Sequence, residues 1–148
     1  DCNLTGEVVE RCAAWKRKIV DGDERETRGR REFLNFGHTL GHALESAAGL
    51  GVLRHGEAVI WGMRAALRLS RRCSGLKAPF AAEADRFLST LPVPLPRRIE
   101  SRRLLDLARR DKKARGGRAR FVLLRAPGRP LVAFVPDKDI LRAIQEIL

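Results

Sequence analysis

Glycine and proline divide this sequence into short segments with helical periodicity, and this punctuation limits the fold more than any other feature. Proline cannot continue a helix interior and glycine weakens one, so helices are expected to begin or end near these residues. The 148 residues include 13 glycines and 7 prolines. Helices are predicted over 7–18, 31–48, 56–74, 79–90, 101–110 and 137–148.

The pattern changes to that of strands near the carboxyl end. Short, mostly apolar runs predict strands over 120–125 and 131–135, joined by a turn over 126–130 that contains Pro127 and Gly128. The predicted fold class is therefore mainly α, a single domain of about six helices with one small β-hairpin.

Charge and composition narrow the class of partner. The formal net charge is +12 and the isoelectric point is about 11.1, which favours anionic partners, either nucleic acid or phosphorylated and carboxylated metabolites. Aromatic residues make up only 5% and tyrosine is absent, so a base-stacking surface is poorly supplied. The longest stretch without a charged residue, 33–44, is too short to cross a bilayer. We expect no nucleic acid and no membrane partner.

The cysteines indicate a reducing setting. The three cysteines are odd in number and have no CxxC spacing, which argues against a disulfide framework and a cysteine metal site. We therefore expect a cytoplasmic protein.

The histidines are the most informative residues. All three lie within residues 38–55. On a continuous helix over 31–48, turning about 100° per residue, apolar side chains form a core-facing stripe: Phe36, Leu40, Ala43, Leu44 and Ala47. The opposite face would carry a set suited to chemistry: Arg31, Asn35, His38, His42 and Glu45.

Two kinds of chemistry fit this face. Histidines four residues apart on a helix can bind one metal ion, and neutral imidazole can transfer protons near neutral pH. Spacing alone would pair His38 with His42 on the metal, while a histidine pair that binds nothing remains an alternative. His55 begins the next predicted helix, and an antiparallel return of that helix would bring it toward His38. Six glycines between residues 37 and 62 indicate close packing or close approach of a ligand.

The histidine segment resembles 3-dehydroquinate synthase. The matching residues are Asp23 to Glu26 (DERE), Arg31, 34–45 (LNFGHTLGHALE), 55–59 (HGEAV), Gly62 with Met63, and a later DKK followed by a glycine turn and the FVLL strand. The resemblance spans essentially the whole chain and corresponds to the carboxy-terminal, mainly helical domain of those enzymes. Related sugar-phosphate cyclases share these motifs, so another cyclase of the superfamily is an alternative.

The resemblance implies an activity and its cofactors. Such enzymes convert 3-deoxy-D-arabino-heptulosonate 7-phosphate to 3-dehydroquinate and phosphate in the shikimate pathway of aromatic amino acid biosynthesis. They use NAD and a divalent metal, usually zinc with cobalt as another candidate, which acts as a Lewis acid. NAD would be bound mainly by a domain that is expected upstream and is absent from this chain. This fragment alone is expected to be inactive.

The resemblance also implies residue roles. His38 and His55 would be metal ligands, in place of the His38 and His42 pair that spacing suggests, and a third ligand is expected upstream. His42 would transfer a proton or contact substrate. The other catalytic or substrate-contacting residues would be Lys16, Arg31 (at the substrate carboxylate), Asn35 and Lys112 (near the phosphate).

Some positions depart from the family pattern. The segment between Asp23 and Asn35 is one residue longer than usual in the family. The catalytic or substrate-contacting lysine assigned to Lys16 could therefore be Lys18 instead. Within the DKK motif, the lysine near the phosphate is either Lys112 or Lys113. Trp61 stands where relatives usually have a smaller residue.

The expected partner is a small phosphorylated substrate, and the full-length enzyme is expected to be a homodimer. A remote alternative is a basic nucleic-acid-binding module that uses the arginines of 97–120.

Overall fold

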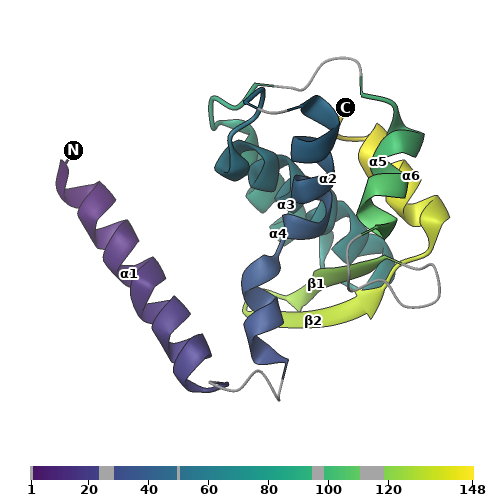
Figure 1. Cartoon of the computed structure of the whole chain (residues 1–148). Coiled ribbons are helices and arrows are strands. Elements are labelled where there is room, and N and C mark those ends of the chain that lie inside the picture. Colours follow the sequence, from purple (N-terminus) through teal and green to yellow (C-terminus); the bar gives the residue numbers. More distant parts are fainter. Residues whose placement is uncertain (1, 24–28, 50, 95–98, 111–118) are drawn as a thin grey trace. The chain divides into compact units, whose positions relative to one another are not determined.

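The computed structural model describes residues 2–23, 29–49, 51–94, 99–110 and 119–148. The described elements are helices and one hairpin (Figure 1), which confirms the predicted mainly α class with one small β-hairpin. In chain order they are α1 (Cys2–Asp21), the 3-10 helix η1 (Arg30–Asn35), α2 (His38–Ala48), α3 (His55–Cys73), α4 (Ala78–Ser89), α5 (Ser101–Arg109), β1 (Arg120–Ala126), β2 (Arg129–Phe134) and α6 (Asp137–Gln145). The chain divides into two compact units, Asp1–Leu34 and Asn35–Leu148.

The first unit consists of α1 and the segment that follows it. The helix has 20 residues and extends beyond both predicted ends. Its Trp15 is exposed, and the Lys18 ammonium lies 5.1 Å from the centre of the indole ring. Asp23 is buried, and its carboxylate accepts a hydrogen bond of 2.7 Å from the backbone N–H of Arg30. Asp23 therefore helps to close the connection between α1 and η1.

The predicted continuous helix over 31–48 is wrong. A 3-10 helix ends at Asn35, and Gly37 then adopts a left-handed conformation with φ of 84°, so α2 begins only at His38. Glycine reaches this region without the clash that a Cβ would cause. Because the helix axis is interrupted, counting 100° per residue does not place Arg31 and Asn35 on the histidine face.

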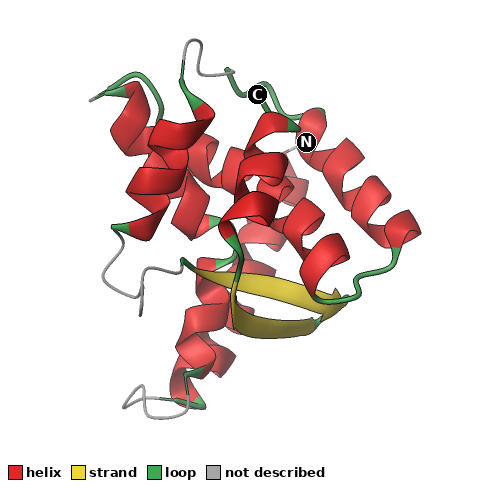
Figure 2. Ribbon diagram, turned by 90° about the vertical axis from the view of Figure 1, so that its right-hand side faces the viewer, coloured by secondary structure: helices red, strands yellow, loops and turns green. Residues whose placement is uncertain are grey.

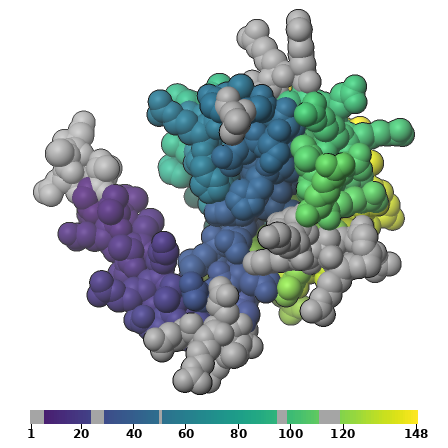
Figure 3. Space-filling view, viewed as in Figure 1, coloured from purple at the N-terminus to yellow at the C-terminus, as the bar shows by residue number. Residues whose placement is uncertain are grey.

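Within α2 the predicted core stripe is largely confirmed. Leu40, Ala43 and Leu44 are buried, whereas Phe36 and Ala47 are only partly buried. Leu44 joins a core cluster with residues from α3, α5, the hairpin and α6, among them Leu69, Leu104, Leu123, Ile140 and Ile144. Figure 3 shows the atoms of α2 beside those of α5, in keeping with the packing of these two helices.

Glycines let α2 and α3 cross at backbone contact. A Cβ built on Gly62 would lie 1.9 Å from the carbonyl oxygen of Gly37, and one built on Gly41 would lie 3.1 Å from the Cα of Val59. The close packing expected from glycine is confirmed at these positions. It also sets the antiparallel register of the two helices, which faces the end of α2 toward the start of α3.

Trp61 lies on the side of α3 that contacts Pro94, in the segment after α4. Its side chain is buried, and its indole N–H donates a hydrogen bond of 3.1 Å to the carbonyl of Pro94. The guanidinium of Arg64 lies 4.7 Å from the ring centre. Both the polar and the aromatic parts of this large residue are therefore satisfied.

The hairpin pairs β1 with β2 in antiparallel register, with Leu123 opposite Leu131 (Figure 2). Its turn is shorter than predicted, because only Pro127 and Gly128 lie between the strands. Leu124 stands opposite Pro130, which has no N–H to donate. The Ser74 hydroxyl donates to the Leu124 carbonyl instead, at 2.6 Å.

The last two helices begin at the predicted residues, Ser101 and Asp137. Glu100 is the N-cap of α5. Pro136 is the N-cap of α6, and Asp137 lies in the first turn, where its carboxylate pairs with Arg109 of α5. In the part of the chain that the structure describes, no helix is long and apolar enough to cross a membrane.

Candidate metal centre

The three histidines come from the first two turns of α2 and the first residue of α3. His38 and His42 lie one turn apart on α2, and their ring centres are 5.6 Å apart. The His55 ring centre lies 5.3 Å from that of His38 and 5.5 Å from that of His42. The predicted return of His55 toward His38 is confirmed.

Neighbouring oxygens occupy one nitrogen on each of two rings. His55 Nδ1 lies 3.2 Å from Glu45 Oε2, and His38 Nδ1 lies 3.4 Å from the carbonyl oxygen of Phe36. When Nδ1 donates to such an oxygen, Nε2 is left with its lone pair for another partner, which is the usual arrangement of metal-binding histidines.

The environment favours the neutral form of His38. Burial lowers the pKa of its imidazole, and the nearby rings of His42 and His55 lower it further, against the opposing effect of the Phe36 carbonyl. A neutral imidazole is the form that binds metal ions. His42 and His55 are exposed, so a ligand can reach the cluster from solvent.

The donor set fits a metal ion, although it is incomplete. Imidazoles are common ligands of zinc and cobalt. Over the described ranges, however, no group of three or more histidines, cysteines, aspartates or glutamates is arranged to hold an ion. The residues are therefore suited to supplying part of a coordination shell.

The contact of Glu45 with His55 was missed from the sequence. Sequence reasoning placed Glu45 on the histidine face but favoured a solvated or helix-pairing carboxylate. The available signal was its position three residues after His42, on the same side of α2. Glu57 lies in the first turn of α3 and has a capping role: its carboxylate accepts a hydrogen bond of 2.8 Å from the backbone N–H of Arg54.

Of the other predicted site residues, Asn35 belongs to the same unit as the histidines. Asn35 is the last residue of η1 and is partly buried. Lys16 is exposed on α1, and Arg31 is partly buried in η1. Both belong to the first unit and are described only within it. Lys112 lies outside the described residues.

The fold is similar to that of solved sugar-phosphate cyclases. One is a 2-deoxy-scyllo-inosose synthase complexed with carbaglucose-6-phosphate, NAD+ and Co2+, which matches with a TM-score of 0.79 and 23% identity over 95% of this chain and 40% of that chain. Another is ValA, the 2-epi-5-epi-valiolone synthase from Streptomyces hygroscopicus subsp. jinggangensis 5008 with NAD+ and Zn2+ bound, with a TM-score of 0.73 and 24% identity over 95% of this chain and 39% of that chain.

Curated relatives have higher sequence identity. The 3-dehydroquinate synthase of Arthrobacter sp. (strain FB24) is 47% identical over 146 residues, which cover 95% of this chain and 39% of the relative. That of Psychrobacter cryohalolentis is 41% identical over 142 residues, covering 95% of this chain and 38% of the relative. The chain thus spans about two fifths of the length of these relatives.

The family model described as 3-dehydroquinate synthase C-terminal matches residues 2–114, which include all three histidines. By this match, the chain belongs to the 3-dehydroquinate synthase C-terminal family.

Proposed function

We propose that this chain is the metal- and substrate-binding domain of a 3-dehydroquinate synthase, a lyase that converts 3-deoxy-D-arabino-heptulosonate 7-phosphate to 3-dehydroquinate and phosphate. The observation that carries the proposal is the cluster of three imidazoles with ring centres no more than 5.6 Å apart. The identity of 41% to 47% with enzymes of that name supports it.

His38 and His55 are the proposed metal ligands. Both have Nδ1 beside an oxygen, which leaves Nε2 of each ring for the ion. The metal, zinc or cobalt, would supply Lewis-acid polarisation of substrate oxygens. We propose that a further ligand comes from the part of the enzyme that the relatives have and this chain does not cover.

His42 is the proposed proton-transfer residue. It is exposed and its ring lies beside both proposed ligands, so it can reach a substrate held at the metal. A group in this position can take a proton from a hydroxyl or return one near neutral pH.

The remaining proposed roles are binding roles. Arg31 binds the substrate carboxylate, for which its planar guanidinium offers two parallel N–H donors. Asn35 contacts a substrate hydroxyl. Lys16 and Lys112 place positive charge near the anionic substrate, Lys112 at the phosphate. Their contacts depend on how the two units and the rest of the enzyme assemble on the substrate.

NAD is the proposed second cofactor, and it would supply transient hydride acceptance. Two structurally similar cyclases hold NAD+ together with Co2+ or Zn2+. We propose that NAD is bound mainly by a domain upstream of this one, that the full-length enzyme is a homodimer in the cytoplasm, and that this fragment alone is inactive.

The alternative within the superfamily is a cyclase that acts on a different sugar phosphate. The two structurally similar cyclases make other products, but at 23% and 24% identity they show the fold alone. Identification of the product by mass spectrometry separates the two functions.

The test uses a chimera in which this chain replaces the matching residues of the Arthrobacter relative. We expect the chimera to release phosphate from the substrate. His38→Ala should lose bound metal and reduce turnover by at least about a hundredfold, because a ligand matters at least as much as its supporting contacts. Metal content is measured by emission spectrometry and turnover by phosphate release.

His42→Ala is the matched variant. It should keep the metal and lose about 10² to 10⁴ in turnover, the range for a general acid or base. Unchanged metal content and turnover in His38→Ala would refute the assignment.

A further inference from the structure

A second polar region lies toward the other end of α3. A hollow of about 560 Å³ lies between α3, α4 and the end of the chain, and an adjoining hollow of about 500 Å³ lies between α3 and α6. Both are lined in part by Arg68, Arg71 and Glu146. We call the combined feature the arginine hollow and define it by its charged residues: Arg68, Arg71, Arg72, Asp85, Arg86, Asp139, Arg142 and Glu146.

The arginine hollow is separate from the histidine cluster. His55 is the first residue of α3 and Arg71 lies near its end. At 1.5 Å of rise per residue the two positions are about 24 Å apart along the helix axis. A ligand of a few ångströms cannot contact both.

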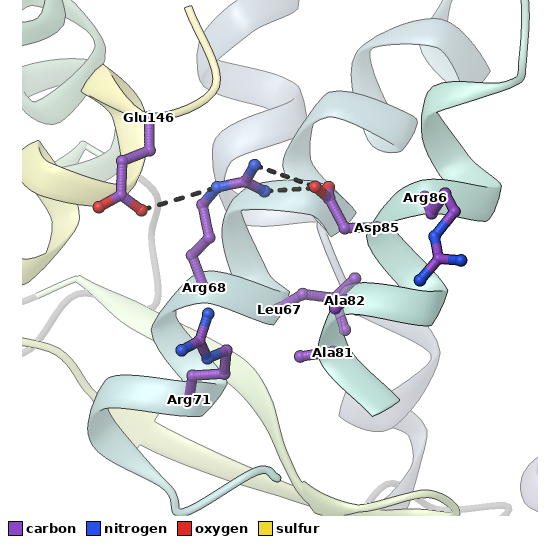
Figure 4. A pocket seen from close by; sticks show the side chains of 8 residues that line it. All are labelled: Leu67, Arg68, Arg71, Ala81, Ala82, Asp85, Arg86 and Glu146. Atoms are coloured by element: carbon purple, nitrogen blue, oxygen red, sulfur yellow. Dashed lines mark hydrogen bonds and ion pairs between the residues drawn. The ribbon is translucent and has the colours of Figure 1, made fainter. Parts of the chain in front are cut away.

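Two of its three carboxylates, those of Asp85 and Glu146, are already engaged with arginines. Asp85 accepts hydrogen bonds from Arg64 Nε at 2.8 Å and from both terminal nitrogens of Arg68 at 3.0 Å. Arg68 also reaches Glu146, with Nε 3.7 Å from Oε2, so its side chain spans the two carboxylates (Figure 4). Glu146 contacts Arg72 as well, and Arg142 at 3.5 Å.

Several guanidinium groups keep unused donors. In the described parts of the chain, the side chains of Arg71 and Arg86 have no ion-pair or hydrogen-bond partner. Arg72 Nη1 is buried without a hydrogen-bond partner. A buried donor on a charged group is costly unless something accepts from it. The lining contains five arginines and three carboxylates. The arginine donors that lack a partner therefore leave the hollow with an excess of positive charge.

We propose that the arginine hollow binds a small phosphorylated anion through Arg71 and Arg86, which line the same hollow of about 560 Å³. Phosphate oxygens match the planar fork of guanidinium donors, and each hollow has a volume in the range of small-molecule sites. Arg68 is held in place by Asp85 and Glu146, so it presents fixed positive charge beside the ligand. The proposal concerns a site distinct from the histidine cluster and stands independently of the proposed function.

The experiment titrates the 148-residue chain with inorganic pyrophosphate by isothermal calorimetry. We expect saturable binding with one site per chain. Arg71→Gln combined with Arg86→Gln should weaken binding by at least about tenfold, since one charge-assisted hydrogen bond corresponds to about that factor. The matched control is Arg102→Gln with Arg103→Gln, which removes the same charge from exposed positions of α5 outside the hollow and should change binding less than about twofold.

A second measurement does not depend on any variant. In the unsubstituted chain, pyrophosphate should shift the amide signals of 68–72, 82–86 and 142–146 in nuclear magnetic resonance spectra. Absence of saturable binding, equal weakening by both double variants, or amide shifts confined to other segments would each overturn the proposal. A single-stranded oligonucleotide is titrated in parallel. The oligonucleotide could displace pyrophosphate, with both double variants weakening oligonucleotide binding equally. In that case the arginine hollow is part of a general basic surface and the proposal is wrong.

Discussion

Glu45 orients the imidazole ring of His55. Its position on α2 alone did not identify this partner. Its carboxylate lies 3.2 Å from His55 Nδ1, and the two side chains are 42% and 53% exposed. A carboxylate behind a histidine selects the tautomer with Nε2 free and raises the basicity of that nitrogen. In a half-exposed pair this orienting effect, more than the ion pair itself, is what the contact contributes.

We predict that Glu45→Gln weakens zinc binding by the 148-residue chain about tenfold, the lower end of the range for such supporting contacts. The amide keeps the shape of the side chain but loses its charge. Zinc affinity is measured by competition with a chromophoric chelator at pH 7. Glu57→Gln is the control, because Glu57 binds the backbone of Arg54 and should affect the stability of α3 without affecting zinc affinity. Equal affinities for the chain and Glu45→Gln would contradict the prediction.

The crossing of α2 and α3 is the structural element on which the histidine cluster depends. Gly62 lies against the backbone of Gly37, and Gly41 lies against that of Val59. Each contact joins one turn of α2 to the opposing turn of α3. The same register, continued one turn further, brings Glu45 to His55.

We predict that Gly62→Ala lowers the free energy of unfolding by at least about 3 kcal/mol, as strong overpacking does. Its Cβ would meet backbone atoms at 1.9 Å and 2.8 Å, which cannot move aside as a side chain can. Urea denaturation followed by circular dichroism measures the change. A decrease of less than about 1 kcal/mol in the free energy of unfolding would contradict the prediction, because it would mean that the two helices move apart easily.

Gly56→Ala is the matched control on the same helix. A Cβ at Gly56 would have no atom within 4 Å. It should therefore leave stability unchanged or raise it by up to about 1 kcal/mol, the difference in helix propensity between alanine and glycine.

Across the whole molecule, positive charge is held in a network that joins three helices. Asp85 of α4 binds Arg64 and Arg68 of α3, and Glu146, just after α6, contacts Arg68 and Arg72. In a chain of net charge +12, these carboxylates offset the mutual repulsion of the guanidinium groups. Burial alone would raise the pKa of Asp85, but hydrogen bonds from Arg64 and Arg68 outweigh it and hold that pKa below its ordinary value.

The lowered pKa predicts how stability depends on pH. A carboxylate whose folded pKa is depressed stabilises the fold fully above its unfolded pKa, about 3.9, and this stabilisation is lost as pH falls through the folded value. We therefore expect Asp85→Asn to lower the free energy of unfolding by about 1 to 3 kcal/mol at pH 7, with the difference shrinking below pH of about 4.

Urea denaturation of the chain and Asp85→Asn at a series of pH values measures this difference. Asp106→Asn is the control of equal charge change, since Asp106 is exposed on α5, and it should alter stability little at any pH. A pH-independent difference for Asp85→Asn would be incompatible with the ion-pair explanation.

Local sequence patterns were sufficient to predict most helices and strands. They were insufficient to predict the contacts between them. Proline and glycine punctuation located the helices after α2 to within a few residues, but α1 begins well before its predicted start, and Gly37 interrupts the segment 31–48. That error arose because periodicity alone cannot detect a left-handed residue between two helical turns. The bonds from Ser74 to Leu124 and from Arg68 to Asp85 were not predicted, since their partners are far apart in the sequence.

The amino-acid sequence by itself determined the mainly helical class, the hairpin, the histidine motif and membership of the family, because each rests on local spacing or on residue identity. The sequence predicted that His55 returns toward His38, but only the tertiary structure decided how close the three rings lie, that Glu45 contacts His55, and that arginines of three helices line the arginine hollow. These relations depend on helix crossings, and the crossings are set by backbone contacts such as that of Gly62 with Gly37, between residues that no local pattern connects.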